Sequence, residues 1–273
     1  MLAVASAALV CVVSAALAQT AAGARAPNPA TCDRASFRMV VDVGHTEGGG
    51  ARSARAVSEY DYNLRQATEI VQALQVGGFA KAELLITTDK KRRGLFTRSG
   101  HANKHAAHLF LSIHHDSVPN KFIEKWEFEG EEYSFSDRFK GHSIFISNDN
   151  LDRKGSLLFG QLLGREMKGR GLQYTPHYTE AFMGKRRRKL VDADAGVYRF
   201  DQLVVLRTTR MPAVLLEAGS IINRDEELEL RTPERRALIT TSVVDAVAAF
   251  CKLRRPNETV STRRRTNSKT PKQ

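Results

Sequence analysis

The sequence predicts an α/β domain, and three features of the chain support this. Three apolar, β-branched runs, at 37–43, 109–113 and 213–216, have the composition of buried strands in a parallel-type sheet. Amphipathic segments of helical length lie between them, which gives the strand–helix alternation of an α/β fold. A chain of 273 residues can hold one sizeable hydrophobic core and does not need a second one.

The first predicted helix has the clearest limits. Ser58 can cap its N-terminus, and Gly77 and Gly78 stop it. Apolar side chains recur at helical spacing between these limits, at Tyr60, Leu64, Ala67, Val71 and Leu74. We expect further helices over 97–107, 151–168 and 233–251.

Short apolar runs bounded by polar residues predict the remaining strands. With the three runs above, they give about six strands, at 37–43, 83–87, 109–116, 142–147, 202–206 and 212–217.

Two long segments interrupt the alternation. Residues 117–141 hold six aromatic side chains among six acidic ones, in an otherwise basic protein. Because they directly follow the strand that ends at Asp116, we expect them at the rim of a ligand crevice. Residues 169–199 include the basic run Lys185–Lys189. Loops of this length are usually functional or mobile, so either segment could gate a site.

Both ends of the chain lie outside the predicted domain, which spans 36–253. Residues 1–18 are uncharged, mostly apolar and end on Ala-Leu-Ala, a pattern typical of a signal peptide with its cleavage site. No basic residue precedes this run, and a membrane anchor is the alternative, although about 17 apolar residues are marginal for spanning a bilayer. Residues 19–35 are interpreted as a linker, and the basic, polar residues 254–273 as a disordered tail.

The formal net charge of +12 predicts polyanionic surroundings. Nucleic acid, an anionic membrane face and an acidic cell-wall polymer would each provide them. Export favours the wall polymer, so we expect no nucleic-acid partner and no stable membrane insertion. The run Lys185–Lys189 resembles a nucleic-acid patch, but we interpret it as a solvated loop or a contact to anionic wall polymer.

Cysteine usage fits an exported protein. Cys11 lies inside the expected signal peptide and would leave with it, so Cys32 and Cys251 remain at the two ends of the domain. In an oxidising compartment such a pair predicts a disulfide that joins the termini. Two unrelated thiols are the alternative.

Three predicted strands end on side chains that can bind a metal. These side chains are His45, His114 and Glu217. The carboxyl ends of strands in an α/β sheet face the ligand crevice, so we expect the three to converge. Two histidines and a carboxylate are the ligands of a catalytic zinc site, which leaves one position open for water. Glu59, in the first turn of the first helix, is a further candidate, although the helix dipole alone would favour a carboxylate there.

Short motifs surround these residues in order along the chain. They are Asp42-Val43-Gly44-His45, Glu59 with Asn63-Leu64, Ser112-Ile113-His114-His115-Asp116 and Leu216–Asn223, with Arg98, Ala102-Asn103, Val205-Leu206-Arg207 and Met211-Pro212 between them. Together they resemble the zinc-dependent N-acetylmuramoyl-L-alanine amidases of the amidase-3 type, enzymes of bacterial cell separation. The resemblance runs from about Phe37 to Phe250.

The resemblance implies both a fold and a site. The fold is a twisted, mostly parallel sheet with helices on both faces. His45, Glu59 and His114 would bind one zinc ion, and Glu217 would be the catalytic carboxylate. The resemblance also implies that Arg98, Asn103 and Arg207 bind substrate.

The chain departs from the family pattern in three places. His115 replaces a residue that is small in many relatives and could compete with His114 for the metal, but strand alternation points it the other way. The loop after His45 is Thr-Glu-Gly-Gly-Gly, and segment 117–141 is longer than the usual connection.

The function implied is hydrolysis of the amide bond between N-acetylmuramic acid and L-alanine in peptidoglycan, in the periplasm, for wall remodelling or daughter-cell separation. Zinc would lower the pKa of a bound water to about 7. Glu217 would take the water proton and deliver it to the leaving amine. We expect a monomer, with an activator protein as a further partner. Another zinc-dependent wall-peptide hydrolase (a carboxypeptidase or endopeptidase) and a catalytically silent peptidoglycan-binding protein are the alternatives.

The other histidines are interpreted as surface or loop residues. His101, His105 and His108 share one face of a predicted helix and could mimic a metal site, but the sequence offers no carboxylate at matching spacing. His177, within 169–199, could contact substrate.

Overall fold

A computed structural model describes residues 32–254, except residue 90. They form one α/β domain around a seven-stranded sheet with the strand order β2-β1-β3-β9-β6-β8-β7, as well as a two-stranded hairpin, β4-β5. Neighbouring strands of the large sheet are parallel except for the pairs β6-β9 and β7-β8. The predicted α/β class and mostly parallel sheet are confirmed.

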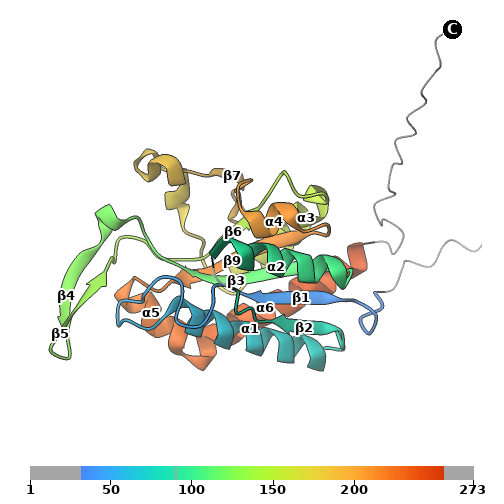
Figure 1. The fold of residues 1–273 in the computed structure, drawn as a ribbon, viewed down its shortest axis with the longest axis horizontal. Coiled ribbons are helices and arrows are strands. Elements are labelled where there is room, and N and C mark those ends of the chain that lie inside the picture. Colours follow the sequence, from blue (N-terminus) through green and yellow to red (C-terminus); the bar gives the residue numbers. More distant parts are fainter. Residues whose placement is uncertain (1–31, 90, 255–273) are drawn as a thin grey trace, which may run out of the picture. The chain divides into compact units, whose positions relative to one another are not determined.

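The strands and helices follow one another along the described chain (Figure 1). The strands are β1 (Met39–Val43), β2 (Ala82–Leu85), β3 (Leu109–Asp116), β4 (Glu124–Phe128), β5 (Glu131–Phe135), β6 (Ser143–Ile146), β7 (Lys189–Asp192), β8 (Val197–Arg199) and β9 (Ala213–Ser220). The α-helices are α1 (Glu59–Val76), α2 (Lys91–Lys104), α3 (Arg153–Gly169), α4 (Val204–Thr208), α5 (Arg224–Arg231) and α6 (Pro233–Leu253). Short 3-10 helices cover Asn120–Phe122, Pro176–Thr179 and Ala181–Arg186.

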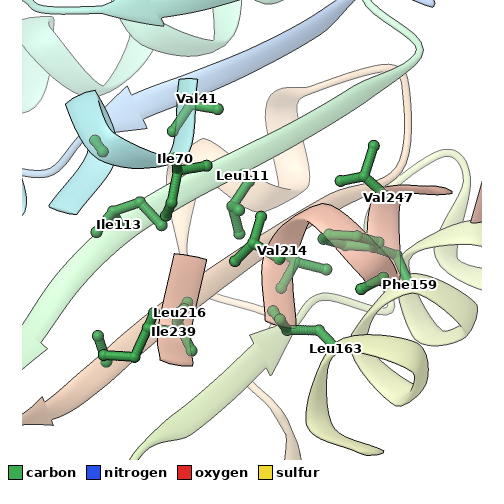
Figure 2. Close-up of a cluster of buried hydrophobic side chains, with 14 of the residues drawn as sticks. Val41, Ile70, Leu111, Ile113, Phe159, Leu163, Val214, Leu216, Ile239 and Val247 are labelled. Carbon is green, nitrogen blue, oxygen red and sulfur yellow. The ribbon is translucent and has the colours of Figure 1, made fainter. Parts of the chain in front are cut away.

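Side-chain alternation along the strands builds a hydrophobic cluster on each face of the sheet. On one face Val41, Leu111 and Leu216 pack against α1, α3 and α6, as Figure 2 shows for part of this cluster. On the other face Val40, Phe110 and Leu215 pack under α2 and α4. Figure 1 shows α1, α5 and α6 on one side of β1 and β3 and α2 and α4 on the other. Helices therefore cover both faces, as predicted.

Helix α1 begins where the sequence indicates. The Ser58 hydroxyl accepts a hydrogen bond from the Asp61 backbone N–H, which caps the helix, and Gly77 ends it. The residue that follows the cap, Glu59, is thereby fixed at the N-terminus of α1.

The strand predicted at 202–206 is wrong. These residues lie in a turn and the short helix α4, although Val204, Val205 and Leu206 are typical of strands. The Asn150 side-chain amide donates hydrogen bonds to the carbonyls of Leu206, Thr209 and Met211. These bonds satisfy carbonyl groups that the C-terminal end of the helix leaves unpaired. Tertiary contacts thus override the local preference.

Three other boundaries differ from the predictions. Helix α2 begins at Lys91, six positions before the predicted start at 97, although it contains two glycines. Segment 117–141 is largely the β4-β5 hairpin, which projects from the domain in Figure 1. Segment 169–199 contributes β7 and β8, so the sheet has seven strands rather than about six.

Cys32 and Cys251 form a disulfide, with 5.2 Å between their Cα atoms. It ties the start of the described chain to the last turns of α6. The expected signal peptide at 1–18 lies outside the described residues, as do most of the linker and nearly all of the tail. Among the described helices, none has the length and apolar character needed to cross a membrane.

Candidate active site

The carboxyl ends of β1, β3 and β9 bring together three of the four residues expected at the reaction centre. His114 on β3 and Glu217 on β9 are direct partners in the parallel register. Both alternate with residues of the α2 and α4 face, namely Phe110 and Leu215, and therefore point to that side of the sheet. His45 lies two residues beyond the end of β1, the strand next to β3.

Glu59 links the two histidines. Its Oε2 lies 3.0 Å from His45 Nε2, and its Oε1 lies 2.9 Å from His114 Nδ1. Backbone N–H groups of Ala51 and His115 also donate to this carboxylate, and it is 5% exposed. Burial opposes its ionisation, but the hydrogen bonds from His114 and His45 outweigh burial and hold the pKa of Glu59 below its ordinary value. Glu59 is therefore held as an anion between two imidazoles.

Two glycines make room for this arrangement. A Cβ atom on Gly44 would lie 2.5 Å from His114 Nε2. Gly50 has a φ of +86°, and a Cβ there would lie 2.6 Å from Glu59 Oε2 and 2.9 Å from His45 Cδ2. His45 itself has a φ of 65°, an unusual left-handed conformation for a residue other than glycine. The backbone is thus shaped around the three side chains.

Arg98 on α2 fixes the end of β1. Its guanidinium donates to Asp42 Oδ1 at 2.5 Å and to the backbone carbonyls of Val43 and His45. Arg98 is 3% exposed, and Asp42 also accepts a hydrogen bond from Ser112. These contacts engage Nη1 and Nη2 of Arg98 within the protein, which adds a positioning role to the predicted contact with substrate. The geometry indicates that Arg98 positions His45.

Glu217 is a buried carboxyl group whose pKa is raised. Its Oε2 is buried and has no hydrogen-bond partner among the described residues. Burial, reinforced by the nearby charges of Asp116 and Glu59, raises the pKa of Glu217 well above its ordinary value. Asp116 accepts a hydrogen bond of 2.6 Å from the Tyr178 hydroxyl, and burial raises the pKa of Asp116 to about 7.

A cavity of about 430 Å³ opens beside this centre. His45, His114 and Arg98 line it together with Leu95 of α2 and residues at the start of α4, Leu203, Val204 and Val205. Its lining includes no residue of segments 117–141 or 169–199. The expectation that 117–141 forms the rim of the crevice therefore does not match this cavity.

Asn103, Arg207 and His177 do not line this cavity, and His115 points away from it. The Asn103 amide donates to the Thr208 carbonyl and accepts from the Arg210 N–H, so it joins α2 to the end of α4. Arg207 lies on α4, half-buried. His115 points to the opposite face, as alternation predicted, where its Nδ1 lies 2.8 Å from Asn63 Oδ1. His177 is buried and stacked on Phe139.

The sequence did not single out Asp42 or Tyr178 as parts of this site. A signal for Asp42 exists, because it is a charged residue inside the buried strand β1 and must find a partner there. No local signal indicates Tyr178, which reaches Asp116 from a connection more than 60 residues away in sequence.

The donor set fits a divalent metal ion. The nitrogen and oxygen atoms of His45, Glu59 and His114 lie within 4.8 Å of one another. Two imidazoles and one carboxylate match the ligand chemistry of zinc and leave a position open. Glu217, whose buried Oε2 has no hydrogen-bond partner among the described residues, is the register partner of His114 on the neighbouring strand.

Comparison with known proteins decides the family. A protein-family model described as N-acetylmuramoyl-L-alanine amidase matches residues 39–249, which include all four residues of the centre. The chain belongs to this family. Family membership makes it an N-acetylmuramoyl-L-alanine amidase, a hydrolase whose substrate is the peptidoglycan of the cell wall. A curated relative from Buchnera aphidicola, named provisionally as an N-acetylmuramoyl-L-alanine amidase, is 23% identical over 223 residues, which are 78% of this chain and 95% of the relative.

Solved structures of amidases share the fold. The N-acetylmuramyl-L-alanine amidase Ami1 of Mycobacterium smegmatis has a TM-score of 0.62 and 15% identity, over 81% of this chain and all of that one. The CwlD amidase of Clostridioides difficile, whose structure includes the GerS lipoprotein, has a TM-score of 0.53 and 17% identity, over 80% of this chain and all of that one. At these identities the likeness concerns the fold.

Proposed function

We propose that this amidase depends on zinc and that His45, Glu59 and His114 hold the ion, with Glu217 as the catalytic carboxylate. One observation carries the proposal. Glu59 joins His45 to His114, and the register of β3 and β9 places Glu217 beside His114. When bound, zinc would act as a Lewis acid that polarises the scissile carbonyl and lowers the pKa of a water molecule.

The residues of the chain would perform the other steps. Glu217 takes a proton from the attacking water and delivers it to the amine of L-alanine as the amide bond breaks. Burial and the charges of Asp116 and Glu59 raise the pKa of Glu217, which makes its carboxylate a stronger base toward the water proton. Arg98 holds the carbonyl of His45, and with it the imidazole, at a fixed place at the end of β1.

The cavity would take the substrate. Its apolar wall at Leu95 and at Leu203 to Val205 can contact the lactyl or alanyl methyl groups, while His45 and His114 reach the amide. Asn103 would support this wall through the packing of α2 against α4, and Arg207 on α4 would contact substrate.

We propose further that the enzyme acts as a monomer in the periplasm, in wall remodelling or cell separation, after removal of residues 1–18. Residues 36–253 would constitute the catalytic domain, in line with the extent of the family match. The Cys32–Cys251 disulfide supports an oxidising compartment. A partner protein that controls access to the site is consistent with the lipoprotein bound to CwlD.

Product analysis tests the proposal. Protein purified with zinc, then chelated, then reloaded is incubated with peptidoglycan, and the soluble products are analysed by mass spectrometry. We expect free stem peptides with an L-alanine amino terminus, lost on chelation and restored by zinc. Release of shortened peptides without a free L-alanine amine would contradict the reaction, and full activity in chelator would contradict the metal dependence.

A further inference from the structure

A second cluster of potential metal ligands lies on the α2 side of the sheet, at its β2 edge. It consists of Glu83 on β2, His101 in the last turn of α2 and His105 just beyond that helix. One donor atom from each of the three lies within 4.8 Å of the others. We propose that Glu83, His101 and His105 form a second metal site, which binds a divalent transition ion that prefers imidazole, with Zn²⁺ as the representative.

The fold brings these side chains together in two ways. Glu83 alternates with Leu85, whose side chain belongs to the cluster under α2 and α4, so Glu83 also faces α2. His101 and His105 are one helical turn apart, and the His105 N–H donates to the His101 carbonyl at 3.0 Å. They therefore share one face of the helix end.

The distances are close to those a metal needs. His101 Nε2 lies 2.8 Å from Glu83 Oε1, and the rings of His101 and His105 are stacked with centroids 4.2 Å apart. Donors on one tetrahedral zinc lie about 3.3 Å apart, because each bond is about 2.0 to 2.2 Å long. His105 is exposed and can rotate to close the remaining gap. The partly exposed setting leaves room for water ligands.

His108 does not belong to this set. The Arg38 backbone N–H donates to His108 Nδ1, and the Arg38 guanidinium lies 3.0 Å from His108 Nε2. Both ring nitrogens are thus engaged. The sequence analysis set aside a metal site at His101, His105 and His108 because it found no carboxylate at matching spacing. In the structure Glu83 of β2 supplies that carboxylate beside His101.

An ion at this site would tie α2 to the sheet. Helix α2 carries Gly94 and Gly100, which lower its intrinsic helix stability, and its Leu95 and Phe96 are exposed. Arg98, one turn before His101, holds the end of β1 on which His45 depends. Occupancy of the second site would therefore stabilise the helix that positions His45, although the two sets of ligands are separate.

Metal stoichiometry tests the proposal without any measurement of activity. Protein stripped of metal is dialysed to equilibrium against buffered Zn²⁺, and bound zinc is determined by elemental analysis. We expect two zinc ions per chain in the wild type and one in Glu83→Gln or His105→Gln. Glu131→Gln, an exposed carboxylate of the hairpin, is the matched control and should keep two. Two zinc ions in His105→Gln, or a single zinc in the wild type that His105→Gln retains, would overturn the second site.

A second experiment tests this metal site independently of the proposed catalytic zinc site. The double variant His45→Ala/His114→Ala loses the first site and should still bind one zinc, which raises its melting temperature because the ion binds only the folded state. Adding His105→Gln to this background should abolish both the binding and the rise. If the rise persists, the bound zinc lies elsewhere and the second site is refuted, whatever the fate of the catalytic metal.

Discussion

Arg98 and Asp42 form a buried ion pair that joins α2 to β1, with 2.5 Å between Nη1 and Oδ1 and side chains that are 4% and 1% exposed. The same guanidinium holds the carbonyls of Val43 and His45. The backbone at the end of β1 and at His45, which has a left-handed conformation, is thus held in place by one side chain of α2.

Loss of Arg98 should therefore be costly for both stability and activity. Arg98→Ala leaves Asp42 as an unpaired buried charge, which lowers the free energy of unfolding by about 3–5 kcal/mol. Urea denaturation measures this loss, and Arg92→Ala, an exposed arginine on the same helix, is the control with little expected effect. A stability of Arg98→Ala equal to that of Arg92→Ala would show that the pair contributes nothing.

Gly50→Ala should disturb the centre more than Gly48→Ala. Both glycines have positive φ, +86° and +69°, so each substitution carries a similar backbone cost of about 1–2 kcal/mol. Only the Cβ at Gly50 would collide with Glu59 and His45, whereas the one at Gly48 meets nothing within 4 Å. We expect the turnover of Gly50→Ala to fall about 100-fold, since a misplacement of about 1 Å has that effect. Equal turnover of the two variants would exclude crowding of the site.

Acid should destabilise the fold through His142. Burial, with a smaller contribution from Arg235, lowers the pKa of His142 to about 3, and the side chain is 1% exposed. The unfolded chain has the ordinary pKa of about 6.5, so it binds the proton more tightly. Stability is therefore fully present above pH 6.5 and is lost as the pH falls toward 3, by about 2 kcal/mol at pH 5.

His142→Gln should reduce this loss. The free energy of unfolding measured in urea at pH 7.5 and pH 5 gives the acid-induced change for each protein. We expect a smaller change in the variant, while the buried His177, whose pKa burial lowers to about 4, still contributes to it. An identical acid-induced change in both proteins would mean that His142 is not the responsible group.

The disulfide should stabilise the domain. It closes a loop of 219 residues between Cys32 and Cys251, and removing it should lower the free energy of unfolding by about 2–5 kcal/mol. Cys32→Ser/Cys251→Ser should unfold at lower urea concentration than the oxidised wild type, and a reductant should shift only the wild type. Two free thiols per chain in the mature, oxidised protein would refute the bond itself.

The sequence indicated the sheet because its signals are local. Runs such as Met39–Val43 and Ala213–Leu216 are apolar enough to be strands in any context, and Ser58 with Gly77 delimits a helix by capping chemistry. The partners of the centre could also be inferred, since strand ends in an α/β sheet converge. Alternation along β3 put His114 and His115 on opposite faces, and the family resemblance favoured His114 as the ligand.

Other features depend on contacts between distant segments and escaped prediction. Val204 to Leu206 forms a helix because Asn150, more than 50 residues earlier, binds its last carbonyls. Arg98 was expected to meet substrate, and its hydrogen bonds to Asp42 and to the His45 carbonyl add a positioning role that the sequence did not indicate. Glu83 comes near His101 only through the pairing of β2 with β1 and the packing of α2 above them. None of these contacts can be inferred from the spacing of residues along the sequence.

The measurement that tests the central claim most directly compares zinc content with turnover in Glu217→Gln. The substitution keeps the shape of the side chain beside His114 but removes its ability to accept a proton. We predict unchanged zinc at the His45, Glu59 and His114 site and hydrolysis of peptidoglycan reduced by several orders of magnitude. Near-wild-type hydrolysis by a zinc-loaded Glu217→Gln protein would contradict the role of Glu217 and the account of the site built around it.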